Sequence, residues 1–99
     1  MLNIEKNTNE TGLTFALTGR LDTTTAPELE KELKASLDSV TTLVINMTAL
    51  DYISSAGLRV LLSAQKTMNK QGEMKVVHVG ETIMEIFEVT GFSDILTIE

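Results

Sequence analysis

Large apolar residues recur with two different periods along the chain, every second residue in some segments and about every three and a half residues in others. This alternation constrains the fold more than any other feature of the sequence. In residues 13–17 every second residue is large and apolar, a period that predicts a strand with one buried face. Leu29, Leu33 and Leu37 instead recur every fourth residue, which places them on one face of a helix. The sequence therefore predicts a domain that contains both strands and helices.

The predicted elements follow one another through short connections, so residues 1–99 are expected to form a single domain. Strand–helix–strand repeats imply right-handed crossovers and parallel pairing, and an opening hairpin adds an antiparallel strand. We therefore predict an α/β fold, with a mixed sheet of four to five strands and helices packed on it. In chain order we expect an edge strand over 2–6, a turn over 7–12, a strand over 13–17, a helix around 29–37, a strand over 43–45, a helix over 58–68, a strand over 74–79, a helix over 83–87 and a strand over 95–98.

Local signals add detail to this order. Thr25 and Glu28 have the spacing of a capping box, and Pro27 suits the first turn of the helix that follows. The apolar run 43–45 predicts either a strand covered on both faces or a central parallel strand. Gly72 and Gly91 are expected to end the second and third helices.

Composition excludes several classes of function. The chain carries 14 acidic and 8 basic residues, and it lacks the clustered cations and the aromatic platform that nucleic acids need. It has no cysteine and one histidine, His78, which excludes thiol chemistry and a multi-histidine metal site. No apolar run is long enough to span a membrane, and residues 1–10 lack the features of a secretory signal. We expect a cytoplasmic protein with no metal, no cofactor, no direct contact with nucleic acid and no membrane insertion.

Two adjacent serines, Ser54 and Ser55, stand where the second helix should begin. One interpretation is structural, because either hydroxyl can cap the helix, which is worth about 1 kcal/mol. The other interpretation is functional, because a single cap suffices and there are two serines. Gly57 in the first turn also costs about 1 kcal/mol relative to alanine, which indicates that something approaches the backbone closely there. The serines also follow a parallel strand, where open α/β sheets place functional groups, and a helix start accommodates a phosphate. The functional interpretation therefore predicts a phosphorylated serine.

Four segments, in this order and spacing, resemble the STAS domains of bacterial anti-sigma factor antagonists: LTGRLD at 17–22, LVIN at 43–46, YISSAGL at 52–58 and GF at 91–92. In that family the loop before the helix usually reads Asp-Ser-Ser/Thr-Gly-Leu, and the first serine after the aspartate is phosphorylated. The resemblance places that serine at Ser55. Ser54 then stands in place of the aspartate, and Ala56 in place of the second hydroxyl residue.

The resemblance also implies partner switching. The unphosphorylated antagonist binds an anti-sigma factor, which is a serine kinase of the histidine-kinase-like ATPase class, and a sigma factor is freed. The kinase then phosphorylates the antagonist and the complex separates, and a PP2C-type phosphatase restores the hydroxyl. On this interpretation the chain is a substrate and a switch, and not an enzyme.

The candidate partner-binding residues surround this serine. Asp22 can contact a partner or support the start of the helix that follows it. Three neighbouring apolar side chains can belong either to a docking surface or to the core, namely Tyr52, Ile53 and Leu58. Arg59 can also be a solvated helix residue, and Asn46 can bond the serine loop or cap its own turn. The full set of candidates is Asp22, Ile53, Ser54, Ser55, Ala56, Gly57 and Arg59.

Two other classes of function stay open on the sequence. Ser55 could be the nucleophile of an enzyme with His78 as its base, but the local sequence is not Gly-x-Ser-x-Gly. A STAS domain can also be the partner or regulatory subunit of a lipid- or anion-transport system. That role needs no switch serine, so the presence of Ser55 favours the antagonist.

Overall fold

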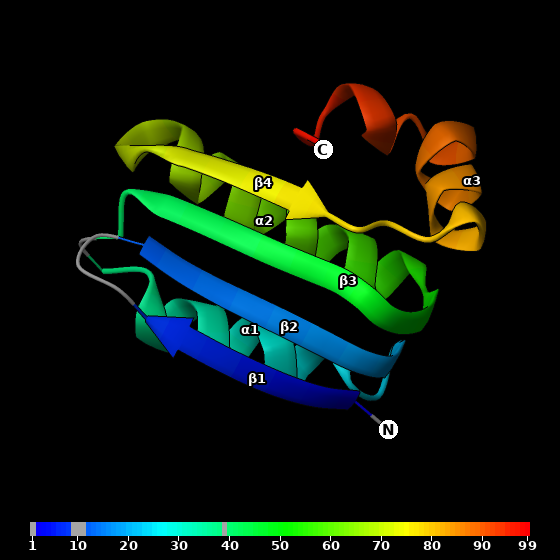
Figure 1. The fold of residues 1–99 in the computed structure, drawn as a ribbon, viewed down its shortest axis with the longest axis horizontal. Coiled ribbons are helices and arrows are strands. Elements are labelled where there is room, and N and C mark those ends of the chain that lie inside the picture. Colours follow the sequence, from blue (N-terminus) through cyan, green and yellow to red (C-terminus); the bar gives the residue numbers. More distant parts are fainter. Residues whose placement is uncertain (1, 9–11, 39) are drawn as a thin grey trace.

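Strands and helices alternate after an opening hairpin, as the apolar spacing predicts (Figure 1). The computed structural model describes residues 2–8, 12–38 and 40–99, so much of the predicted turn over 7–12 lies outside the described residues. The elements are β1 (Leu2–Thr8), β2 (Gly12–Leu21), α1 (Ala26–Ser36), β3 (Thr42–Ile53), α2 (Ser55–Gln71), β4 (Glu73–Val77), α3 (Glu81–Thr90) and a 3₁₀ helix, η1 (Phe92–Asp94).

The four strands form one mixed sheet in the order β1-β2-β3-β4 (Figure 1). β1 pairs with β2 in antiparallel orientation, and the β2–β3 and β3–β4 pairs are parallel. The predicted α/β fold with a mixed sheet is therefore confirmed. Because all the parallel strands point the same way, the ends of β2 and β3 and the start of α2 meet at one edge of the sheet.

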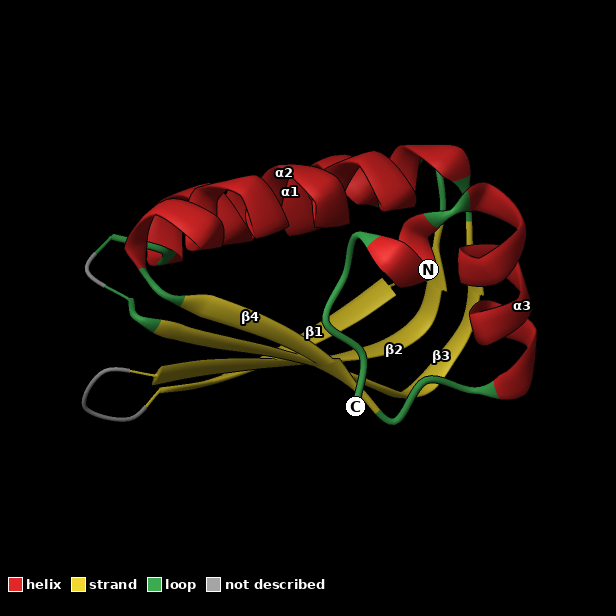
Figure 2. Cartoon of the chain, turned by 90° about the horizontal axis from the view of Figure 1, so that it is seen from above, coloured by secondary structure: helices red, strands yellow, loops and turns green. Residues whose placement is uncertain are grey.

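One face of the sheet carries the core. Figure 2 shows α1 and α2 on that face of the sheet, and Figure 1 shows that they lie side by side there. Leu43 and Ile45 of β3 point into it and are fully buried, whereas Val44 points to the other face and is only half-buried. The prediction of a central parallel strand at 43–45 is confirmed, and coverage on both faces is wrong. The other fully buried large side chains are Phe15, Phe87, Leu13, Leu17, Leu21, Leu29, Met47, Ile53, Leu61 and Met68.

β3 is much longer than predicted, because residues 46–53 continue the strand instead of forming a loop. Its pairing with β2 shifts register twice, between Ala16 and Thr18 and between Gly19 and Arg20 of β2. At the first shift Asn46 Oδ1 accepts hydrogen bonds from Thr48 N (2.9 Å) and Thr48 Oγ1 (2.6 Å). Asn46 therefore stabilises its own irregularity in the strand and does not bond the serine loop. Such bulges increase the twist of a strand, and here they precede the edge of the sheet at which α2 begins.

The last part of the chain differs from the prediction. β4 ends at Val77 rather than at Val79, since His78 adopts a positive φ of 56° that breaks the ladder. α3 ends at Gly91 (φ 84°), as expected. The strand predicted over 95–98 is wrong, because Ile95 and Leu96 donate their N–H groups to the Phe92 carbonyl at 3.0 and 2.9 Å and so form a turn. Only an isolated parallel bridge between Val76 and Ile98 remains.

Candidate functional site

The two serines at the start of α2 have different roles. Ser54 is the N-cap, with extended backbone (φ −100°, ψ 175°), and its Oγ accepts a long hydrogen bond of 3.4 Å from Gly57 N. Ser55 is the first residue of the helix, and its side chain is exposed. Among the described residues its hydroxyl has no hydrogen-bond partner. The cap that the structural interpretation requires is therefore Ser54, and Ser55 is not needed for capping.

A backbone hydrogen bond joins the start of α2 to the end of β2. Ser54 N donates to the Leu21 carbonyl at 2.9 Å, so the serines lie directly beside Asp22. A Cβ atom on Gly57 would lie 2.7 Å from Leu21 Cγ and 2.9 Å from Ile53 Cγ1. The close approach predicted at this glycine is confirmed, and it is the reason that α2 can begin so near the strands.

Arg20 and Tyr52 form a second pair at this edge. The sequence indicated Tyr52 as a docking candidate but did not reveal Arg20 or the pairing. They are register partners on β2 and β3, and the Arg20 guanidinium lies 4.4 Å from the centroid of the Tyr52 ring. Arg20 Nε is also 3.7 Å from Asp22 Oδ2, with an Arg20 side chain that is 55% exposed. Arginine and tyrosine are enriched at the energetic centres of protein interfaces. The signal that could have found Arg20 is its position at the carboxyl end of a parallel strand, next to the end of the strand that carries Tyr52.

Asp22 organises the turn between β2 and α1. Its Oδ1 accepts hydrogen bonds from Thr25 N (3.1 Å) and Thr24 N (3.0 Å), and these bonds, the one from the Thr25 amide first, lower the pKa of the carboxyl below its usual value of 3.8. Thr25 Oγ1 donates to the Arg20 carbonyl (2.8 Å) and accepts from Asp22 N (2.8 Å), so the predicted capping box with Glu28 is wrong. Asp22 does support the helix start, as one of its two interpretations predicted.

Asp22 should therefore make stability depend on pH. A carboxyl with a lowered folded-state pKa stabilises the fold above its unfolded value, and this contribution is lost as the pH falls from about 4 through the folded pKa. We expect the native protein to be more stable than Asp22→Asn at neutral pH, and the difference to narrow below about pH 4. Urea unfolding at a series of pH values measures this. If the free energy of unfolding changed with pH in the same way for the two proteins, the prediction would be wrong. Asp51→Asn, at the same edge, is a matched control.

Several predicted docking residues are not available to a partner. Ile53 is 2% exposed and Leu58 is 5% exposed, so both belong to the core, and Gly57 is buried as well. The prediction of Ile53 as a docking residue is therefore wrong, because the second register shift in β3 turns it inward and Tyr52 outward. Tyr52 is 36% exposed and is the apolar side chain that remains at this surface.

The other candidates stay accessible. Ser55 and Arg59 are exposed, while Asp22, Ser54 and Ala56 are half-buried. Together with Arg20 and Tyr52, these five residues form the surface that we call the serine edge.

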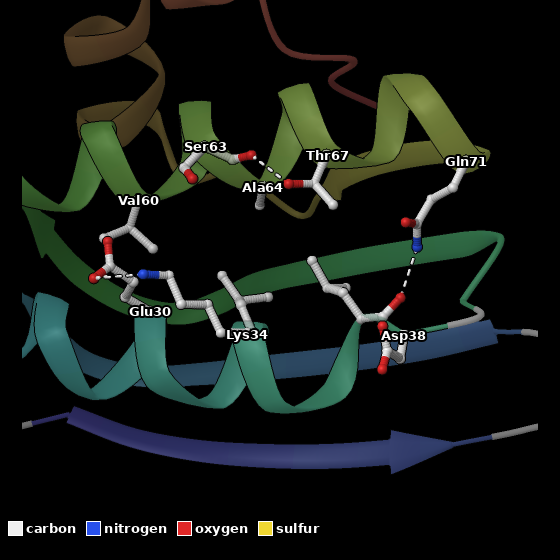
Figure 3. Close-up of a pocket in the computed structure, with 10 residues that line it drawn as sticks. Glu30, Lys34, Asp38, Val60, Ser63, Ala64, Thr67 and Gln71 are labelled. Atoms are coloured by element: carbon white, nitrogen blue, oxygen red, sulfur yellow. Dashed lines mark hydrogen bonds and ion pairs between the residues drawn. The ribbon is translucent and has the colours of Figure 1, made fainter.

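A groove runs from the serine edge along the seam between α1 and α2. A hollow of about 220 Å³ beside Ala56 and Arg59 shares Glu30 and Val60 with a second hollow of about 220 Å³ farther along. Figure 3 shows the second hollow, where side chains of α1 and α2 face each other and Gln71 closes the far end. Gln71 Nε2 donates to the carbonyls of Leu37 (2.6 Å) and Val40 (2.7 Å), which ties α2 to the segment before β3.

Comparison with known proteins identifies the family. The residue pattern of the STAS domain matches residues 3–99. The chain belongs to the STAS domain family. This STAS domain is 38% identical over 88 residues to BtrV of Bordetella bronchiseptica, which covers 87% of this chain and 76% of BtrV. It is 29% identical over 98 residues to the anti-sigma-B factor antagonist of Bacillus subtilis, which covers 98% of this chain and 90% of that protein. The resemblance to STAS-domain anti-sigma factor antagonists is thus confirmed.

Solved structures show the same fold. An anti-sigma factor antagonist from Mycobacterium paratuberculosis superposes with a TM-score of 0.89 at 24% identity, over 99% of this STAS domain and 85% of that chain. The Bacillus cell fate determinant SpoIIAA in its phosphorylated form superposes with a TM-score of 0.77 at 16% identity, over 98% and 91% of the two chains. Within the described residues of this STAS domain, no helix is long and apolar enough to cross a membrane.

Proposed function

We propose that this STAS domain is an anti-sigma factor antagonist that is switched off by phosphorylation of Ser55. The unphosphorylated form binds an anti-sigma factor, which is also a serine kinase of the histidine-kinase-like ATPase class, and so releases a sigma factor. A PP2C-type phosphatase restores the free hydroxyl. The observation that carries the proposal is the exposed Ser55 hydroxyl at the start of α2, which has no partner in the part of the chain that the structure describes, beside a separate cap at Ser54. Relatives named anti-sigma-B factor antagonists support it.

The charges around Ser55 explain how a phosphate would act. A phosphoserine adds about −1.5 to −2 charges at pH 7. The first turn of α2 contains no acidic residue, so the free N–H groups and the helix dipole can receive the phosphate without rearrangement of the fold. A docked partner would have to take this charge out of water near Asp22, and desolvation of an ion costs several kcal/mol even when the ion is paired. Phosphorylation therefore blocks docking directly, and each 1.4 kcal/mol of that cost lowers the affinity about tenfold.

The test combines a candidate kinase with ATP and locates the phosphate by mass spectrometry. We expect one phosphate, on Ser55, and an affinity of the phosphorylated form for the anti-sigma factor that is at least about tenfold lower. Ser55→Ala should accept no phosphate and keep binding. Ser63→Ala, which removes another exposed hydroxyl of α2, is the matched control and should behave like the native protein.

Two outcomes would contradict the proposal. Phosphate on Ser54, or on neither serine, would show that the switch is not at Ser55. Amide spectra of the two forms provide the second check, because direct blocking confines the shift changes to the serine edge. Changes throughout the sheet would mean that phosphorylation acts by reshaping the fold.

A further inference from the structure

We propose that Arg59 binds the phosphoryl group of phosphorylated Ser55, so that the modified helix start carries its own counter-ion. This inference rests on the proposed function and names the residue of this chain that holds the phosphate in place. It is carried by the spacing of the two residues on α2, by the charges of α2, and by the surroundings of Arg59.

The spacing brings the two side chains together. Arg59 follows Ser55 by four residues on α2, and both side chains are exposed. Residues four apart lie on one face of a helix, one turn above the other. Helical side chains lean toward the N-terminus, so a long side chain at 59 covers the turn that contains Ser55.

The charges of α2 favour an anion at its start. The chain has 14 acidic residues, yet none of them lies in the 17 residues of α2, which carries Arg59, Lys66 and Lys70. Arg59 therefore has no carboxylate on its own helix to pair with. The two arginines of the chain, Arg20 and Arg59, both belong to the serine edge. Arg20 is already engaged with Asp22 and Tyr52, so Arg59 is the guanidinium that is available to a phosphate.

The surroundings of Arg59 leave its guanidinium free. Its side chain lines the hollow beside Ala56, across from Glu30 of α1. Glu30 Oε1 is 3.7 Å from Lys34 Nζ, so this carboxylate has its own cation. Arg59 takes part in no ion pair or hydrogen bond with any described residue. A guanidinium can bond two phosphate oxygens at once, a geometry that lysine lacks. Phosphorylation of Ser55 thus supplies an anion for Arg59, which pairs with none over residues 2–8, 12–38 and 40–99.

The experiment places phosphoserine at position 55 during translation, so that no kinase is required, and follows its phosphorus resonance as a function of pH. A nearby guanidinium favours the dianion. We expect the second ionisation constant of the phosphoserine to be about two- to fivefold larger in the native sequence than in Arg59→Gln. Arg59→Lys should fall between them, and salt should reduce the difference, because exposed charges are screened.

Lys66→Gln is the matched control. It removes the same single charge from the same helix, about 16 Å away from Ser55 along α2, given a rise of about 1.5 Å per residue. We expect its titration to match that of the native sequence. Equal titration of native and Arg59→Gln proteins would overturn the inference, as would equal effects of Arg59→Gln and Lys66→Gln.

The two proposals fail separately. If the kinase does not modify Ser55, the proposed function fails, whereas the titration still reports whether Arg59 contacts a phosphate there. If the kinase modifies Ser55 and phosphorylation weakens docking, but Arg59→Gln leaves the titration unchanged, the proposed function stands and the role of Arg59 is wrong.

Discussion

Replacement of Gly72 with alanine is expected to lower the free energy of unfolding by at least about 3 kcal/mol. Gly72 is the residue after α2, and its N–H donates to the Met68 carbonyl at 2.7 Å. A Cβ atom at this position would overlap with the Thr41 carbonyl oxygen and would lie 2.8 Å from Thr41 Cα. The obstacle is backbone, so no side-chain rotation can relieve it. Either α2 or the start of β3 would have to move.

The corner around Gly72 leaves little room for such a movement. The Thr41 carbonyl accepts from Glu73 N at 3.0 Å, and Gln71 holds the carbonyls of Leu37 and Val40. A shift at Gly72 would therefore strain several hydrogen bonds at once. Urea unfolding measures the loss. Gly80→Ser is the control, because a Cβ at Gly80 meets nothing within 4 Å and serine is a good N-cap for α3. Equal stability of the two variants would contradict the prediction.

The second large effect is expected at Gly57, where valine should lower the free energy of unfolding by about 3 kcal/mol. Alanine is a weaker test. Its higher helix propensity stabilises the helix by up to about 1 kcal/mol relative to glycine, and this partly offsets the clash. Valine adds two further methyl groups against Leu21 and Ile53, which are both buried. The first turn of α2 must then move away from the strands, and the hydrogen bond from Ser54 N to the Leu21 carbonyl is lost.

Two comparisons isolate the clash at Gly57. Ser63→Val places valine at an exposed position of the same helix and should cost only its small propensity difference. Leu21→Ala removes the nearest atoms, so the double variant should be less destabilised than the sum of the single changes. Additive effects would show that Gly57 is required for another reason.

The sequence predicted those elements whose burial follows a regular period. The helix stripes and the alternation over residues 13–17 each arise from one buried face, and the ends of α2 and α3 follow from glycines that have clear local roles. The close approach at Gly57 was also predictable, because glycine in a first turn has a cost that needs a reason.

The extension of β3 was not predictable in this way. Two register shifts bury Met47, Leu50 and Ile53, every third residue, which matches neither a regular strand nor a helix. The same shifts decide which residues the serine edge presents, since they bury Ile53 and expose Tyr52. The stacking of Arg20 on Tyr52 depends on this tertiary register, and no local pattern in the sequence encodes it.

The separation of capping at Ser54 from exposure at Ser55 has an evolutionary consequence. Serine, aspartate and asparagine are about equally good N-caps, so position 54 can change among them with little effect on stability. The serine of this chain and the aspartate that the family resemblance implies at this position are therefore interchangeable for the fold, although they differ by a full charge beside the Ser55 hydroxyl. Under the proposed function, duplicated genes can use that freedom: two paralogues in one cell can diverge at position 54 until each is phosphorylated only by its own kinase, and both remain well folded throughout.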